Sequence, residues 1–382
     1  MRRIYLKAQQ KPLSEKPTLC ATERNSIRSN CREIYTRIAT RKPNGGITPD
    51  TAKPLRAKRS DLNSFFSNGA PIWTNFRSFL CGFWEIRSIS HFAITDVNGE
   101  KFSYAHRKSS NGWFDYPAAA SEKHYHLRLG DWSLRESHGT HILRATTSND
   151  TIFEANLKPT KPVVLNGKAK DGVSFKDEGE ASRYFSYTRM EMEGDIVWNG
   201  ETEHFTGSAW MDREFGTWTP TEKQKGWDWF SIQLDNETEL MCYQLRNSTN
   251  GISEWSSGTF VEKDGEFTPL SHEDFTIEPN GFWKSPRTKA VYPSGWKLKV
   301  PKFDLDLTVV PVMDDQELDT RGTTMIVYWE GACEVSGTAN GKNVKGRAYI
   351  ELVGYDRSHD APNLAYFLMG SHFEFPPKFG WD

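Results

Sequence analysis

The stretch HFAITDVNG, residues 91–99, decides the fold class of this chain. Phe92 and Ile94 alternate with their neighbours at the period of a β-strand, and Asn98-Gly99 is a pair typical of a tight hairpin turn. Further Asn-Gly or Asp-Gly pairs separate short strand-like runs at 166–167, 199–200, 250–251, 264–265 and 340–341. Since no longer segment keeps a helical period, the sequence predicts an all-β, antiparallel chain built as a sandwich or barrel.

Length and composition narrow the class further. The chain has 382 residues, which suits two domains, and 13% of them are aromatic, which suits the pleated surface of strands. No apolar run is long enough for a transmembrane helix. The five cysteines contain no Cys-x-x-Cys pair, so neither a disulfide framework nor a zinc site is expected.

The two ends of the chain differ in charge. Residues 1–85 hold 16 Lys and Arg against 6 Asp and Glu, whereas the remainder holds 32 against 44. We expect residues 1–60 to be a disordered or mispredicted basic tail, with an organelle transit peptide as the alternative, because no secretory signal is visible. The localisation therefore stays open. The acidic balance of the remainder argues against a nucleic-acid partner.

Alternation also assigns side chains to the two faces of each strand. In residues 346–355, the polar face consists of Arg347, Tyr349, Glu351 and Tyr355. Such a face is either solvated surface or the lining of a polar-mouthed barrel, and solvated surface is the expectation here.

Two neighbouring runs combine carboxylates with tryptophans at close spacing, SAWMDREFG at residues 208–216 and GWDWF at residues 226–230. In the first run, Trp210, Asp212 and Glu214 share one face of the predicted strand. Arg213 is a candidate partner for these carboxylates, although it points to the opposite face.

In the second run, Asp228 shares its face with the apolar Phe230 and Ile232. A carboxylate there must be paired, hydrogen-bonded or protonated. One interpretation is an acid of raised pKa in an aromatic pocket, where tryptophan faces stabilise a developing cation. The other is a structural network of Asp with Arg and Trp N–H groups that ties two domains together. The short connection at 217–225 predicts that Asp228 joins Asp212 and Glu214 in one cluster.

Other catalytic templates are missing from the sequence. It contains no His-Glu-x-x-His, no Gly-x-Ser-x-Gly and no phosphate-binding glycine loop after a strand. Zinc chemistry, a serine nucleophile elbow and nucleotide binding are therefore not expected. We expect no metal and no cofactor.

Eight tracts, in the order of the chain, resemble one known superfamily. They are HFAITDVNG (91–99), GDWSL (130–134), LKPTKPVVLNG (157–167), SRYFSYTR (182–189), GSAWMDREFG with GWDWF (207–230), YPSGWKLKVP (292–301), YWEGACEVSG (328–337) and GRAYIELVGY (346–355). This series resembles the AttH-like / carotenoid 1,2-hydratase (hydroxyneurosporene synthase) superfamily. The likeness is closer to the AttH branch, because Arg213, Glu214 and Phe215 stand where the carotenoid hydratases carry His and Trp.

The resemblance implies two lipocalin-like β-barrel domains packed side by side, at residues 61–220 and 221–382. Family members open with an acidic-Trp-Trp-Tyr strand, and here only Phe83-Trp84-Glu85 stands near that place. A first barrel that lacks strands and one that closes are both compatible with this departure.

The resemblance also implies an activity, namely acid-catalysed hydration or cyclisation of a C=C bond in an apolar, isoprenoid-like or polyketide-like molecule. A lipophilic small molecule is thus the expected partner, and the oligomeric state stays open. The candidate catalytic residues are Asp212, Glu214 and Asp228, and the candidate substrate-binding residues are Trp210, Arg213, Trp227, Trp229, Tyr328 and Glu330. Two alternatives remain, a non-catalytic carrier of a lipophilic ligand and an inert protein with a damaged first barrel.

Overall fold

The computed structural model describes residues 4–7, 60–67, 70–81, 85–109, 116–121, 123–147, 151–198, 200–216, 224–249, 251–324 and 326–356. Within these ranges the regular elements are β-strands and one short 3-10 turn, Pro301–Phe303. Every strand pairing given for them is antiparallel except that of β1 with β3. The prediction of an all-β chain is confirmed.

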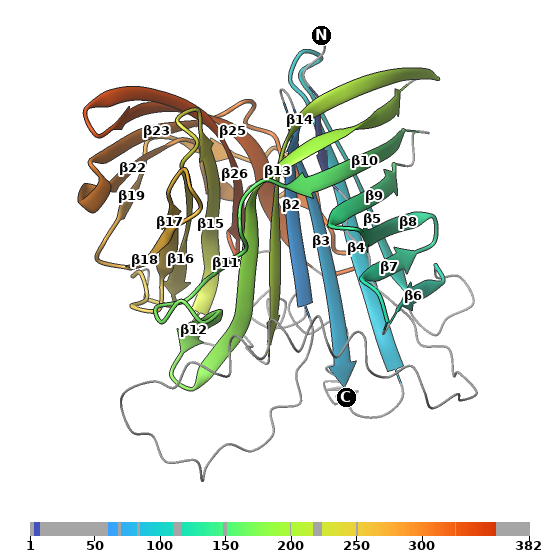
Figure 1. Cartoon of the computed structure of the whole chain (residues 1–382), viewed down its shortest axis with the longest axis horizontal. Coiled ribbons are helices and arrows are strands. Elements are labelled where there is room, and N and C mark those ends of the chain that lie inside the picture. The colour runs from blue at the N-terminus through green and yellow to red at the C-terminus, as the bar shows by residue number, and fades with distance from the viewer. Residues whose placement is uncertain are drawn as a thin grey trace, which may run out of the picture.

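The first unit of the molecule contains two sheets (Figure 1). Sheet A has the order β2 (Ser60–Ser67), β3 (Ala70–Cys81), β1 (Ile4–Lys7), β4 (Glu85–Asp96), β5 (Lys101–Ser109). Sheet B has the order β11 (Val164–Leu165), β13 (Glu180–Trp198), β10 (Ile152–Pro159), β9 (Thr140–Thr146), β8 (Trp132–Ser137), β7 (His126–Leu129), β6 (Ala118–Ala120), and β12 (Val173–Asp177) and β14 (Glu201–Gly216) also pair with β13.

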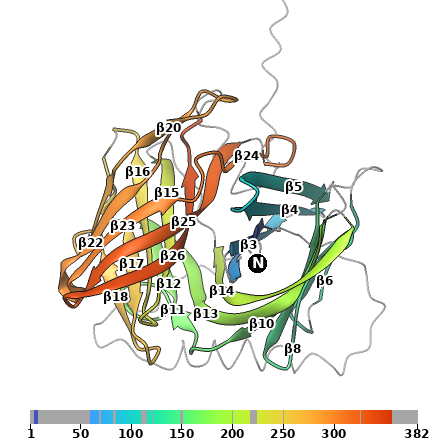
Figure 2. The same cartoon turned by 90° about the horizontal axis from the view of Figure 1, so that it is seen from above.

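The second unit is built around sheet C. Its order is β18 (Phe267–Ser271), β17 (Ser257–Val261), β16 (Glu239–Asn247), β15 (Gln224–Leu234), β26 (Lys342–Val353), β25 (Val327–Ala339), β23 (Leu305–Pro311), β22 (Trp296–Val300), β19 (Thr276–Pro279), with β24 (Glu317–Asp319) beside β25. A separate hairpin joins β20 (Phe282–Lys284) to β21 (Val291–Pro293). Figure 2 shows the two curled units side by side.

Most of residues 1–60, the predicted tail, lie outside the described residues. The exceptions are Ser60 and β1, whose Leu6 pairs with Ile72 of β3 and with Ile94 of β4. Residues 4–7 thus belong to a sheet, which the expectation of a structureless tail did not include. Phe83 and Trp84 also lie outside the described residues.

The hairpin signals and the alternation are visible in the structure. Asn340 and Gly341 have φ values of 49° and 70°, as a type I′ turn requires, and they join β25 to β26. Phe92 and Ile94, both fully buried, face the core of the first unit. A second core, with Phe230, Trp296 and Trp329 among its members, fills the curled sheet C.

The outer face of sheet C packs against the first unit. On this face Tyr349 and Glu351 are each 2% exposed, so the expectation of a solvated Arg347–Tyr349–Glu351 face is wrong for these two residues. The cause is that strands of the first unit cover the face, which a single strand's alternation cannot reveal. A polar, aromatic-rich layer therefore lies between the two units.

Candidate functional site

Asp212 lies on the face of β14 that is turned toward the second unit. Trp210, 0% exposed, and Asp212, 2% exposed, share this face as alternation predicts. The indole Nε1 of Trp210 donates a hydrogen bond of 2.9 Å to Oδ1 of Asp212. The hydroxyl of Ser186, paired with Asp212 across β13 and β14, donates to the same oxygen. Two neutral donors thus fix a buried carboxyl group.

Burial raises the pKa of Asp212 to about 7, because ionisation places a charge in a desolvated site. Hydrogen bonds from Ser186, Trp210 and Tyr184 favour the carboxylate and oppose this effect. The negative Glu214 nearby adds to it. Asp212 therefore exchanges its proton near neutral pH, as a general acid or base must.

Glu214 is paired with a buried lysine. The ammonium of Lys176 lies 3.0 Å from Oε1 of Glu214 and 3.9 Å from the centre of the Tyr243 ring. The pKa of Lys176 is raised, since Glu214 and Tyr243 together outweigh the lowering effect of burial. A fixed cation from β12 thus stands beside the candidate carboxylates.

The tryptophans meet at the same place from both units. Tyr184 and Trp210 of the first unit pack with Trp229 of the second, and the partly buried Trp227 lies against this cluster. The indole Nε1 of Trp229 donates a hydrogen bond of 3.0 Å to the hydroxyl of Tyr184. We call this set, with Asp212, the Asp212 cluster.

Tyr328 and Glu330 lie on β25, and both side chains are fully buried. The hydroxyl of Tyr328 is 2.6 Å from Nδ1 of His91, and Nε2 of His91 is 3.1 Å from the Thr323 hydroxyl. Tyr328 packs in a separate apolar cluster with Ala93. Tyr328 and Glu330 therefore lie in the layer between the units. Their strand, β25, is next to β26 in sheet C, and β26 is next to β15.

Arg213 points away from Asp212, as its position in the strand predicts. Its guanidinium lies 3.9 Å from the centre of the Tyr125 ring and 5.5 Å from that of Phe185. The structure therefore places Arg213 on the opposite face of β14 from Trp210.

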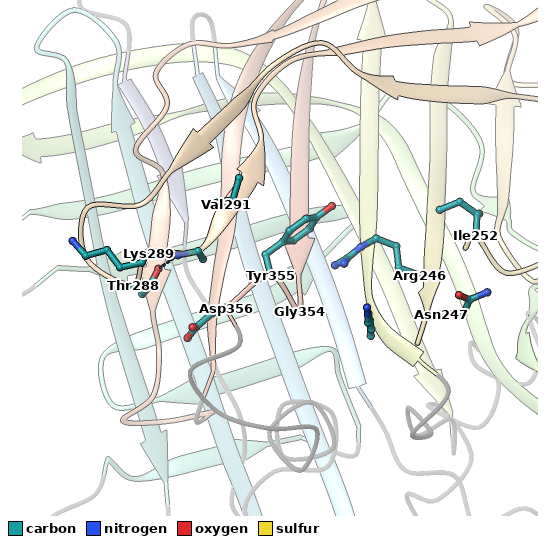
Figure 3. Close-up of a pocket in the computed structure, with 11 residues that line it drawn as sticks. Arg246, Asn247, Ile252, Thr288, Lys289, Val291, Gly354, Tyr355 and Asp356 are labelled. Carbon is teal, nitrogen blue, oxygen red and sulfur yellow. Dashed lines mark hydrogen bonds between the residues drawn. The ribbon is translucent and has the colours of Figure 1, made fainter. Parts of the chain in front are cut away.

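Asp228 has a different set of contacts. Its carboxylate accepts hydrogen bonds of 3.0 Å from Nε of Arg246 and of 2.9 and 3.1 Å from the hydroxyl of Tyr355. Burial raises its pKa, and Arg246 opposes the shift. Arg246 and Tyr355 line a pocket of about 610 Å³ at one end of the second unit (Figure 3). The prediction of one cluster for all three carboxylates therefore does not describe Asp228.

Sequence reasoning missed Tyr184 of the Asp212 cluster, and also Ser186, which donates to Asp212, and Lys176, which pairs with Glu214. A signal existed in SRYFSYTR, where Ser182, Tyr184 and Ser186 alternate on one face of β13. What the sequence did not show is that this face lies beside that of Asp212.

Among the described residues, no group of three or more His, Cys, Asp or Glu side chains is arranged to hold a metal ion. Nor does the described part of the chain contain a helix of the length and apolar character needed to span a membrane.

Comparison with known proteins identifies one family and two similar solved structures. A family model described as AttH-like matches residues 80–355. A solved AttH structure of Nitrosomonas europaea is 27% identical, covers 82% of this chain and 98% of its own, and superposes with a TM-score of 0.68. Kievitone hydratase of Nectria haematococca is 16% identical with the same coverages and a TM-score of 0.63, a likeness of fold alone. No curated protein sequence matches the chain.

Proposed function

This chain belongs to the AttH-like family, and from that premise we propose that it is an enzyme that adds a proton to a C=C bond of an apolar small molecule. The substrate class is isoprenoid-like or polyketide-like. The outcome is hydration where water captures the cation, or cyclisation where a second double bond of the substrate captures it.

One observation carries the proposal, namely that the Asp212 carboxyl group is buried against Trp210 and the aromatic side chains around it, and this burial raises its pKa to about 7. A carboxylic acid that keeps its proton at neutral pH has this proton available for transfer to an activated alkene. Glu214, paired with Lys176, contributes its negative charge and so helps to keep Asp212 protonated. Asp228 has a guanidinium partner instead, and we assign it the positioning of Arg246.

The surroundings of Asp212 suit a cationic intermediate. Trp210 and Trp229 present indole rings in the same cluster, and the ring face attracts positive charge. Trp227 is only partly buried, so the Asp212 cluster reaches toward the surface there. In hydration, the proton moves from Asp212 to one alkene carbon and a water oxygen bonds to the other. The proton that this water loses restores Asp212.

The alternative of a lipophile carrier requires an apolar cavity. In the described residues the interior of sheet C is occupied by large side chains, Phe230, Trp296 and Trp329 among them, all 1% exposed or less. The described pocket beside Arg246 is lined partly by cations. A filled interior of sheet C accommodates neither a carried lipophile nor a substrate, so the proposal of an enzyme depends on the Asp212 cluster between the units. Kievitone hydratase is by its name a hydratase, which supports the view that this fold can host hydration.

Isotope incorporation tests the proposal. The protein is incubated with acyclic isoprenoids and polyenes, squalene and geranylgeraniol among them, in D₂O and separately in H₂¹⁸O. Mass spectrometry then follows deuterium on carbon and ¹⁸O in the product. Hydration incorporates both labels, and cyclisation incorporates deuterium alone.

A matched pair of variants locates the acid. Asp212→Asn keeps the shape and loses the exchangeable proton, so incorporation is expected to stop. Asp195→Asn makes the same change at an exposed position of β13 and should leave it unchanged. Ligand recovered intact with the parent protein would favour the carrier. Equal incorporation by the two variants would exclude Asp212 as the donor.

A further inference from the structure

The pocket at the end of the second unit is separate from the Asp212 cluster. It lies where β15 begins and β16 ends, next to the loop between β20 and β21 and the residues after β26 (Figure 3). Its volume of about 610 Å³ is within the range of sites for small organic ligands. Asp228, beneath it, points to the face of β15 opposite from Trp227 and Trp229. A ligand here would therefore occupy a second site.

A fixed guanidinium lines this pocket. Arg246 donates from Nε to Asp228 and from Nη2 to the Val353 carbonyl, and its guanidinium carbon lies 3.8 Å from the centre of the Tyr355 ring. None of its contacts with described residues uses Nη1. The group is thus held in place on one edge and available to an acceptor on the other, which is the geometry that suits a carboxylate.

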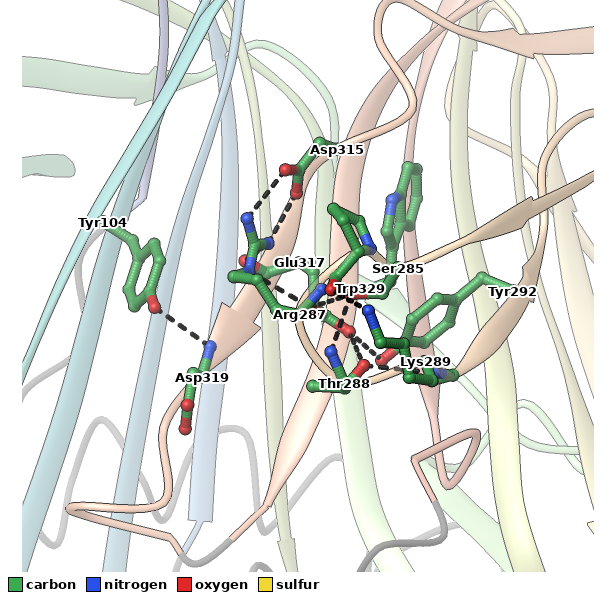
Figure 4. Close-up of polar contacts among 12 residues, drawn as sticks. Tyr104, Ser285, Arg287, Thr288, Lys289, Tyr292, Asp315, Glu317, Asp319 and Trp329 are labelled. Atoms are coloured by element: carbon green, nitrogen blue, oxygen red, sulfur yellow. Dashed lines mark hydrogen bonds and ion pairs between the residues drawn. The ribbon is translucent and has the colours of Figure 1, made fainter.

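The opposite wall is also rigid. Glu317, fully buried, accepts hydrogen bonds of 2.6 Å from both the Ser285 and Thr288 hydroxyls (Figure 4). These contacts fix the loop that presents Thr288 and Lys289 to the pocket. The Lys289 ammonium donates to the Pro286 carbonyl at 2.6 Å, which engages one of its three protons. A site whose walls are held in this way loses little entropy on binding.

The lining combines charge with apolar surface. Lys225, Arg246 and Lys289 outnumber the one carboxylate in the lining, Asp356. The Tyr355 ring, Val291 and Ile252 supply apolar area, and Val291 and Ile252 are 48% and 44% exposed. Exposed aliphatic side chains beside fixed cations match a ligand that is anionic at one end and apolar at the other.

We propose that this pocket binds a small organic carboxylate with an aromatic or aliphatic body. Its carboxylate pairs with Arg246, its body lies against Tyr355 and Val291, and Lys289 on the opposite wall adds positive charge to the pocket. The site is independent of the proposed proton transfer at Asp212, so either can fail without the other.

Calorimetric titration with 4-phenylbutyrate and with its uncharged analogue 4-phenylbutan-1-ol tests the charge requirement. We expect the carboxylate to bind about tenfold more tightly than the alcohol, since charge-assisted hydrogen bonds to the head group are lost with the alcohol. Equal affinities, or no binding of the carboxylate at millimolar concentration, would overturn the proposal.

Two pairs of variants at exposed positions locate the site without disturbing the core. Lys289→Gln should weaken phenylbutyrate binding several-fold, while Lys284→Gln, on the same hairpin but outside the pocket, should not. Val291→Ser should weaken it as well, while Val310→Ser, an equally exposed valine of β23, should not. If both pocket variants bind phenylbutyrate like the parent protein, the ligand lies elsewhere and the assignment is wrong.

Discussion

Asp212 and Asp228 are both buried aspartates on consecutive strands, and they differ in their neighbours. Burial, with the negative Glu214 nearby, raises the pKa of Asp212 to about 7, although the neutral donors Trp210 and Ser186 favour its carboxylate. Asp228 lies 3.0 Å from the Arg246 guanidinium, which favours its ionised form. Burial raises the pKa of both carboxyl groups, and their hydrogen-bond partners oppose this effect, with a guanidinium among them at Asp228.

The pH dependence of stability tests this description of Asp212 without any substrate. In the unfolded chain an aspartate ionises from pH 3.8 upward, whereas in the folded protein Asp212 holds its proton until about pH 7. The folded state therefore loses stability as the pH rises across this interval, by on the order of 4 kcal/mol. Asp212→Asn, which cannot ionise, escapes this loss.

Urea unfolding at pH 4.5, 6 and 7.5 measures the effect. The free energy of unfolding of Asp212→Asn, relative to the parent protein, is expected to increase from pH 4.5 to 7.5. Asp195→Asn, at an exposed position, provides the baseline. A difference between Asp212→Asn and parent that stays constant over this range would show that Asp212 titrates normally.

At the scale of elements, the loop between β20 and β21 depends on one buried carboxylate. Glu317 of β24 accepts from Ser285, Thr288 and Tyr292, and Arg287 pairs with both Glu317 and Asp315 (Figure 4). The loop has no strand partner of its own between Lys284 and Val291. Its conformation is therefore set by backbone hydrogen bonds within the loop, such as that from Ser285 N–H to the Ala290 carbonyl, together with side-chain hydrogen bonds to a neighbouring strand.

Replacing Glu317 with glutamine should release this loop. The amide presents one acceptor oxygen instead of two and no charge for Arg287, so we expect the free energy of unfolding to fall by about 1–3 kcal/mol. Trypsin cleavage after Arg287 or Lys289 should become faster in the folded protein. Glu278→Gln, at an exposed position of β19, is the control. Unchanged cleavage would mean that the loop keeps its conformation without Glu317.

At this scale the sequence predicts what depends on one strand alone, and it does not predict what depends on how two strands pair. Alternation along β14 correctly placed Trp210 and Asp212 on one face. The same rule separates Asp228 from Trp227 and Trp229, but the prediction of one cluster gave the short connection at 217–225 more weight. The partners Tyr184 and Ser186 lie on β13, and only the register of β13 with β14 brings them to Asp212. That register is a non-local property.

At the scale of the whole molecule, buried polar contacts define how the two units meet. They include the pairs His91–Tyr328, Thr95–Gln316, Asn166–Thr259, Ser174–Tyr243 and Lys161–Glu239. A buried polar group left without its partner is costly, so a shifted arrangement of the units is disfavoured at many points at once. The Asp212 cluster, which takes Tyr184 from one unit and Trp229 from the other, depends on this arrangement.

Lys161 provides the strongest test of this coupling. Its ammonium, from the loop between β10 and β11, donates to the carboxylate of Glu239 at 2.8 Å and to the carbonyls of Glu237 and Glu262 at 2.6 and 2.7 Å. All three of its protons are thus used by the second unit, and the Glu239 side chain is 0% exposed. Arg189 of β13 pairs with the same carboxylate at 2.6 Å.

Lys161→Met keeps the length of the side chain and removes the donor, so it leaves two carbonyls without this partner and Glu239 with Arg189 as its remaining cation. The expected cost in the free energy of unfolding is about 3 kcal/mol. The effects of Lys161→Met and Glu239→Gln should be non-additive in a double-mutant cycle, because the two residues share one interaction.

Scanning calorimetry should show one transition for the parent protein and a broadened or split transition for Lys161→Met, since the contact joins the two units. Lys158→Met, at an exposed position of β10, should melt like the parent. If Lys161→Met also melts like the parent, the other contacts between the units are sufficient to hold them together and this ion pair is incidental.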